Sequence, residues 1–198
     1  MKLIRSGIAT FTFVTLLFLV YYLHITFFNI NVIFYSAIVD GMVATFLASL
    51  ILFTVTYFRL FNWFEKTQLI IIWLLAGYAF AISVPTVIDR SLSFYILEKL
   101  QQRGGGIKLN SFEQVFTQEY VKEHRLVDVR LTEQVESGTI HIEDGCVKLT
   151  KKGENIVFFS RMFRRNFLPK HRLLMGQYSD DLTNPFKNSL SISNYLCH

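Results

Sequence analysis

The chain has 198 residues, is 52% hydrophobic and 18% charged, and carries a formal net charge of +5 at pH 7. Its charges are unevenly distributed, since residues 1–87 hold only four of the 20 basic and two of the 15 acidic residues. That part lacks the polar surface that a water-soluble fold needs, so a wholly soluble protein is excluded. The remaining ~110 residues are enough for one small domain with its own core.

Three stretches of residues 1–87 are apolar enough to cross a bilayer, which requires about 20 apolar residues each. They lie near residues 8–23, 32–57 and 68–87. The first stretch could be a cleaved signal peptide, but it lacks a small-residue cleavage site before His24. Tyr21 and Tyr22 at its end are typical of an interfacial anchor. We therefore predict three transmembrane helices.

Asp40 lies inside the second predicted span. A carboxylate in hydrocarbon costs about 3 kcal/mol or more, so it must face a partner, a cavity or the membrane surface. Two alternatives remain: Asp40 contacts another helix or a lipid headgroup, or it lies near enough to the helix end to reach interfacial water. Beside it, Gly41, Ala44 and Ala48, with Ser49, form a small-residue face suited to close helix packing.

The membrane region ends in Asp89, Arg90 and Ser91. Arg90 could bind a headgroup phosphate. Alternatively, Asp89 or Ser91 caps the next helix and Arg90 extends to the interface as an anchor. In that helix we expect an apolar side and a solvated side that carries Glu98 and Lys99.

Residues 88–168 are predicted to form a small soluble domain, followed by a loose polar tail at 169–198. Its first helix, 89–103, ends at three glycines, and a second, 111–121, begins at Ser111 with Gln114 in the capping-box position. In a third helix, 124–137, four apolar residues are expected to face the domain core. Strands 139–142 and 146–149 flank an Asp-Gly turn, and a last helix begins at Glu154. The four inward residues of the third helix are Leu126, Val129, Leu131 and Val135.

The run LTEQVESGTIHIEDGCVKLTKKGENI, residues 131–156, resembles the third helix and wing of winged helix-turn-helix domains. It contains Ser137-Gly138 at the helix end, Asp144-Gly145 at the wing and Leu149-Thr150-Lys151-Lys152-Gly153 on the return strand. The resemblance covers about residues 89–167 and implies a small α+β winged-helix domain. Members of that family bind DNA or dock other proteins, so the resemblance alone does not choose between these roles.

The charges favour protein over DNA. Residues 111–137 carry three basic residues against six acidic ones, and the predicted wing tip is Glu143-Asp144. A DNA-reading helix needs Lys and Arg to neutralise phosphates and reach bases. We therefore expect no sequence-specific DNA binding.

Basic charge gathers instead in residues 148–172, where eight basic residues accompany one acidic residue. Within this run Ile156, Phe159, Phe163 and Phe167 recur at helical spacing, with arginines around the edge of the stripe. Such a helix is typical of contact with an anionic membrane surface, although Phe159 and Phe163 could instead belong to the domain core. The arginines are Arg161, Arg164 and Arg165, and Lys170 lies beyond them.

Charge counts beside the spans do not decide orientation, since four basic residues on one side face three on the other. Cys146 and Cys197 match no metal or redox spacing, and so few cysteines make a disulfide framework unexpected. Unpaired cysteines, the winged-helix resemblance and the basic helix together favour a cytoplasmic soluble domain in a bacterial inner membrane.

No motif for catalysis, metal binding or a cofactor is found in the sequence, so we expect none of these. The chain is interpreted as an accessory or scaffold subunit that docks a membrane-protein partner or a second copy of itself. That partner is expected to be a glycosyltransferase or another enzyme of envelope-lipid or polysaccharide biosynthesis. The alternatives are a membrane-tethered winged-helix regulator and a small enzyme acting on a lipid-linked substrate. The candidate partner or lipid contacts are Asp40, Asp89, Arg90, Arg161, Phe163, Arg164 and Arg165.

Overall fold

The computed structural model describes residues 2–169, 172–183, 185 and 186. The chain forms two compact units, residues 1–128 and residues 129–198, and each is described by itself. The predicted boundary at residues 87 and 88 lies within the first unit.

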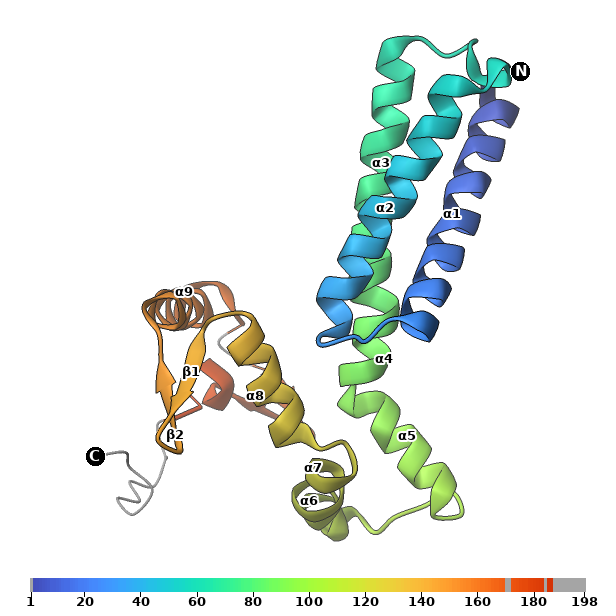
Figure 1. The fold of residues 1–198 in the computed structure, drawn as a ribbon. Helices are drawn as coiled ribbons and strands as arrows, with labels where there is room; N and C mark the ends of the chain where they lie inside the picture. The colour runs from blue at the N-terminus through green and yellow to red at the C-terminus, as the bar shows by residue number, and fades with distance from the viewer. Residues whose placement is uncertain (1, 170–171, 184, 187–198) are drawn as a thin grey trace. The chain divides into compact units, whose positions relative to one another are not determined.

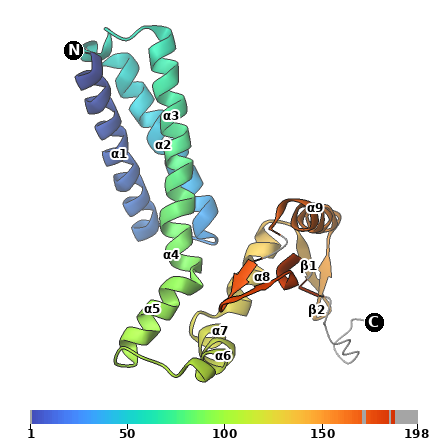
Figure 2. The same cartoon turned by 180° about the vertical axis from the view of Figure 1, so that it is seen from behind.

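The first unit begins with three long helices that run side by side (Figures 1 and 2). They are α1 (Lys2–Phe27), α2 (Ile33–Thr54) and α3 (Trp63–Ala81). The third helix continues through Arg90, so three helices are long and apolar enough to cross a membrane. The predicted number of spans is thus confirmed, and the observed helices differ from the predicted ranges by a few residues at most ends.

Small residues let α2 and α3 approach closely. Gly41, Ala44 and Ala48 are buried, which confirms the predicted small-residue face. At the crossing, a Cβ atom added to Gly41 would lie 3.2 Å from the Cα atom of Gly77. Association of helices in lipid depends on such van der Waals contact, because no hydrophobic driving force separates apolar helices from lipid tails. The aromatic rings of Phe13 and Trp73 stack with centroids 5.6 Å apart and fill the bundle core.

Pro85 lies within the third long helix, in the π-helical segment η2 (Ile82–Thr86), which leads into α4 (Val87–Arg90). Proline has no N–H to bond the carbonyl four residues earlier, which here belongs to Ala81. The hydroxyl of Thr86 donates a hydrogen bond to that carbonyl at 2.7 Å. The helix therefore passes Pro85 with the freed carbonyl satisfied inside the chain.

The helix α5 (Leu92–Gln102) follows, and the side chain of Ser91 accepts a hydrogen bond from the N–H of Phe94. Ser91 is therefore the N-cap, one of the two predicted candidates. Next come the 3₁₀ turn η3 (Leu109–Ser111), α6 (Phe112–Gln114), the π segment η4 (Val115–Tyr120) and α7 (Val121–Glu123). Ser111 makes no side-chain cap, so the predicted capping box is wrong. The preceding turn puts Ser111 at φ −93° and ψ −8°, whereas an N-cap normally has extended backbone.

The helix α8 (Leu126–Glu136) crosses the boundary between the units. It contributes no buried residue, and Val129 and Val135 are 38% and 43% exposed. The prediction that these two valines point into a core is wrong. Leu126 packs against the core of the first unit and Leu131 is half-buried, so the predicted inward side is only partly covered.

The second unit contains the predicted hairpin and helix. Strands β1 (Ile140–Glu143) and β2 (Cys146–Leu149) pair antiparallel, and Asp144 and Gly145 adopt φ of 51° and 74° at the turn. The helix α9 (Lys151–Phe167) begins three residues earlier than predicted, with Thr150 as its N-cap. Gly153 is required at this junction, since a Cβ there would lie 2.2 Å from the carbonyl oxygen of Thr139.

Part of the predicted loose tail is ordered. Strands β3 (Arg172–Leu174) and β4 (Gln177–Ser179) form a second hairpin, so the expectation of an irregular tail is wrong over this range. The short turn η5 (Asp181–Thr183) follows. Predictions for Lys170, Cys197 and the rest of residues 187–198 lie outside the described residues.

Cys146 is disulfide-bonded. The expectation that the cysteines are unpaired is therefore wrong for this residue. Unpaired cysteines therefore no longer support a cytoplasmic location, because disulfides form and persist mainly in oxidising compartments.

The close approach of Gly41 to Gly77 predicts that a larger side chain at Gly41 destabilises the helical bundle. We expect Gly41→Leu to lower the thermal stability of the purified chain in detergent by the equivalent of about 1–3 kcal/mol, because the new side chain overpacks the contact with Gly77. The matched control is Gly7→Leu, since a Cβ at Gly7 meets nothing within 4 Å. Equal melting temperatures of both variants by circular dichroism would contradict the tight crossing.

Candidate functional site

One polar contact lies inside the helical bundle. Asp40 in α2 is 2% exposed, and its Oδ1 atom lies 2.6 Å from Nδ1 of His24 in α1. The other carboxylate oxygen, Oδ2, is buried and has no hydrogen-bond partner among the described residues. Of the two alternatives for Asp40, the contact with another helix is observed, since it meets His24 of α1.

The His24–Asp40 contact satisfies one carboxylate oxygen where no water is expected. The ring of His24 also packs edge-on against Phe28, at 5.6 Å between ring centroids. Pairing across two helices fixes the rotation of α1 against α2, which is a positioning role. Both residues lie in or beside the predicted spans, but the sequence gives no signal that they pair.

The polar cluster at the membrane exit lies at the same end of the bundle. Asp89 is exposed and Arg90 is half-buried at the end of α4. The phenol of Tyr21 lies within electrostatic range of both Asp40 and Asp89. The structure thus brings Asp40 and Asp89 to one neighbourhood.

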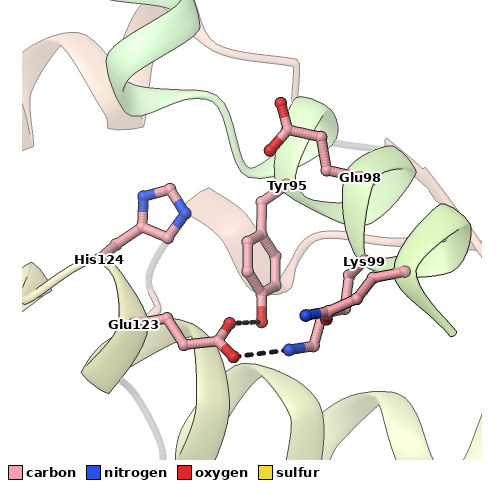
Figure 3. Close-up of a pocket in the computed structure, with 6 residues that line it drawn as sticks. Tyr95, Glu98, Lys99, Glu123 and His124 are labelled. Carbon is pink, nitrogen blue, oxygen red and sulfur yellow. Dashed lines mark hydrogen bonds and ion pairs between the residues drawn. The ribbon is translucent and has the colours of Figure 1, made fainter.

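A second cluster joins α5 to η4 and α7 in the first unit. The ammonium of Lys99 lies 2.6 Å from a carboxylate oxygen of Glu119 and 2.6 Å from one of Glu123. The hydroxyl of Tyr95 donates to Glu123 at 2.9 Å, and Arg103 donates to Glu119 at 3.0 Å. Figure 3 shows Tyr95 and Lys99 converging on Glu123.

Lys99 was expected on the solvated side of its helix, and that expectation is wrong. Its side chain is 4% exposed, because the two carboxylates and the ring of Tyr95 cover it. A signal was present in the sequence: Lys99 and Arg103 are four residues apart, as are Glu119 and Glu123, so two helices carry complementary stripes. Their pairing could not be read from spacing alone.

The network holds its members in their charged forms. Hydrogen bonds to Glu119 and Glu123 raise the pKa of Lys99, and hydrogen bonds from Lys99 lower the pKa of both glutamates. Burial, followed by the hydrogen bond to Glu123, raises the pKa of Tyr95. A lysine held charged cannot act as a nucleophile or base near neutral pH, so the cluster is suited to holding helices together.

An open cavity of about 290 Å³ adjoins this network, lined by Tyr95, Glu98, Lys99, Gln102, Glu123 and His124 (Figure 3). The imidazole of His124 packs on Tyr95 and Tyr120, with ring centroids 5.2 and 4.9 Å apart. The carboxylate of Glu123 is already engaged by Tyr95 and Lys99. No group of three potential metal ligands exists among the described residues.

The predicted contacts on α9 fall on different sides of the helix. Phe163 is 42% exposed and stacks between Phe159 and Phe167, at 5.9 and 5.3 Å between ring centroids. Arg161 and Arg165 are two positions from Phe163, which places them about 200° away around the helix rather than at the edge of its stripe. Arg164 is half-buried and donates to the carbonyl of Leu182 at 3.3 Å.

Comparison with known proteins assigns no family to this arrangement. The chain matches no family model, no curated protein and no solved structure.

The Lys99 network predicts a pH-dependent junction. We expect Lys99→Met to speed hydrogen exchange of the α5 amides severalfold at pH 7, because Glu119 and Glu123 are left facing each other. The glutamates' folded pKa values lie below their ordinary value of about 4.3, so their support is present above that pH and is lost as pH falls through the lower values. The support of Lys99 is present below about pH 10.4 and is lost as pH rises through its raised pKa.

The difference between wild type and Lys99→Met should therefore shrink at acid pH, where both glutamates are protonated. Lys122 is an exposed lysine within α7, and Lys122→Met is the control that should leave α5 exchange unchanged. Identical α5 exchange in wild type and Lys99→Met at pH 7 would mean that the ion pairs do not hold this junction.

Proposed function

We propose that the chain is a membrane-anchored, non-catalytic accessory subunit whose carboxyl-terminal unit docks a partner protein. The observation that carries the proposal is an uncovered apolar face on the β1–β2 hairpin. Ile142, Val147 and Leu149 are 54%, 46% and 49% exposed there.

These side chains lie on the same side of the hairpin. Alternate residues of a strand point to one face, and the register pairs Ile140 with Leu149 and Ile142 with Val147. The opposite face carries the cross-strand pair His141 and Lys148. A hairpin with one apolar and one polar face is stable in water only when the apolar face is covered.

Charge favours a protein as the cover. The turn of the hairpin carries the acidic pair Glu143-Asp144. Acidic side chains beside an apolar face repel both a phosphate backbone and an anionic lipid surface. Apolar contacts inside a polar rim are the usual anatomy of a protein–protein interface.

The order of elements supports a winged-helix assignment for the soluble part. Helices α5, α6–α7 and α8 precede a β-hairpin with an Asp-Gly turn, as in the resemblance drawn from residues 131–156. On that assignment β1 and β2 are the wing, and the wing is the docking element rather than a DNA-reading one.

We infer that the partner is itself a membrane protein, because three spanning helices confine the chain to a bilayer. An envelope-lipid or polysaccharide enzyme such as a glycosyltransferase is the class we propose, and a second copy of the chain is the other candidate. We propose a cytoplasmic location in a bacterial inner membrane. The basic surface of α9 favours that location, and the disulfide at Cys146 counts against it.

Docking through the hairpin can be tested with two matched double variants of the full chain. Ile142→Ser with Val147→Ser removes the apolar face, whereas His141→Ser with Lys148→Ser alters the opposite face at neighbouring positions. Each buried apolar side chain contributes about 1.5 kcal/mol to an interface, so the first pair should weaken partner binding about 100-fold. Purification of each variant in mild detergent with quantitative mass spectrometry measures the loss.

The partner, once identified, is then titrated in purified form against wild type and both variants. Weaker partner binding by the Ile142 and Val147 variant alone supports the proposal. If that variant instead loses a cross-linked dimer, the partner is a second copy of the chain. Equal binding by the two variants would contradict docking through the wing.

A further inference from the structure

The helix α9 carries an uncovered aromatic stripe that the proposed docking face does not include. Ile156, Phe159 and Phe167 are 51%, 58% and 66% exposed, and Phe163 is 42% exposed between them. Their spacing of three or four residues places them on one side of the helix. The alternative that Phe159 and Phe163 belong to a core is therefore wrong.

The side of α9 that packs against the rest of the second unit is not the side that carries the aromatic stripe. Gly153 is buried against Leu149 and the carbonyl of Thr139, and Arg164 reaches the carbonyl of Leu182. Residues 153, 157 and 164 share a side that is about 100° from the aromatic stripe by helical geometry. The second unit thus holds α9 by one side and leaves the aromatic stripe open.

The opposite side of the helix carries basic residues and one phenylalanine, Phe158, which is 74% exposed. Lys151, Arg161 and Arg165 are exposed, and the acidic residue of the helix, Glu154, is already paired with Lys151 at 2.8 Å. Aromatic side chains on one side and arginines on the polar side are the pattern of a helix that lies in the interfacial plane of an anionic bilayer.

We propose that α9 binds an anionic lipid surface, with the Phe159–Phe163–Phe167 stripe in the headgroup–acyl boundary and Arg161 and Arg165 attracted by the negative surface. Two features select lipid over an acidic protein. The stripe is continuous and aromatic rather than pocketed, and the same chain carries three spanning helices, so a bilayer is always at high effective concentration. The proposal does not depend on the partner inferred for the wing.

Photocrosslinking of the full chain in nanodiscs tests this directly. The photoreactive residue p-benzoylphenylalanine replaces Phe163, and the discs contain phosphatidylcholine alone or with about one-third phosphatidylglycerol, a fraction chosen to give a strongly negative surface. Mass spectrometry of α9 peptides should show a lipid adduct that is strong in the anionic discs and weak in the neutral ones. The same probe at Glu154, on the opposite side of the helix with Arg161 and Arg165, should give a weaker adduct than the probe at Phe163.

Variants that remove charge show whether the arginines attract the anionic lipid or whether α9 is merely close to the bilayer. Each basic residue near an anionic surface changes binding about fivefold, so Arg161→Gln with Arg165→Gln should reduce the Phe163-site adduct about 30-fold at low salt. Lys108→Gln with Lys122→Gln removes the same charge from exposed positions of the first unit and should leave the adduct unchanged.

Other outcomes overturn the proposal. A crosslink from the Phe163 position to a second copy would make the stripe a dimer interface. Absence of any adduct in anionic discs, with the helix intact by circular dichroism, would leave it a solvated face. Equal adduct from the Arg161/Arg165 and Lys108/Lys122 variants would show that the arginines do not attract the lipid.

Discussion

The spanning helices of the first unit depend on one constraint: inside hydrocarbon, a polar group without a partner in the chain is costly. The constraint explains why Thr86 bonds the carbonyl that Pro85 leaves free, at 2.7 Å. It also explains why Asp40 is held against His24 rather than turned towards lipid. Close packing at Gly41 and Gly77 brings α2 and α3 together, whereas the Asp40–His24 contact joins α2 to α1.

Outside the bilayer the same chain relies on charge and leaves apolar surface uncovered. The Lys99 network joins α5 to α7 through paired charges rather than a large core, since Tyr95, Val115 and Tyr120 are the fully buried residues of that cluster. In the second unit the β1–β2 hairpin and α9 each present an apolar face. We propose that the hairpin binds a protein and that α9 binds lipid, so one small unit would link a partner to the membrane surface.

Local signals in the sequence predicted most of the elements. Apolar length predicted the three spanning helices, and Asp144-Gly145 predicted the first hairpin because both residues suit the positive φ of its turn. The second hairpin turns at Met175-Gly176 with φ of 48° and 87°, and methionine gives no such signal, so it was missed. The predicted N-cap at Ser111 was wrong for a related reason. The 3₁₀ turn before it sets the backbone of Ser111, and the residue pattern did not show that turn.

Pairings between distant residues could not be predicted. The Asp40–His24 contact and the Lys99–Glu119–Glu123 network each join separate helices, and a single sequence carries no record of which faces meet. The same limit explains the misplaced Lys99, because helical periodicity places a lysine on the solvated side unless a partner is known. Exposure of the α9 stripe likewise depends on what the second unit leaves open, which periodicity cannot show.

The central claim is that three helices span the membrane, and we propose that the soluble part they anchor is cytoplasmic. Fluorescent-protein fusions after Asn31, after Leu60 and at the carboxyl terminus test it most directly, because the fluorescent protein matures in the cytoplasm and a paired alkaline phosphatase fusion is active only outside it. The account predicts fluorescence after Asn31 and at the carboxyl terminus, and phosphatase activity after Leu60. The reverse pattern would contradict the orientation, and the same signal after Asn31 and Leu60 would contradict the second span.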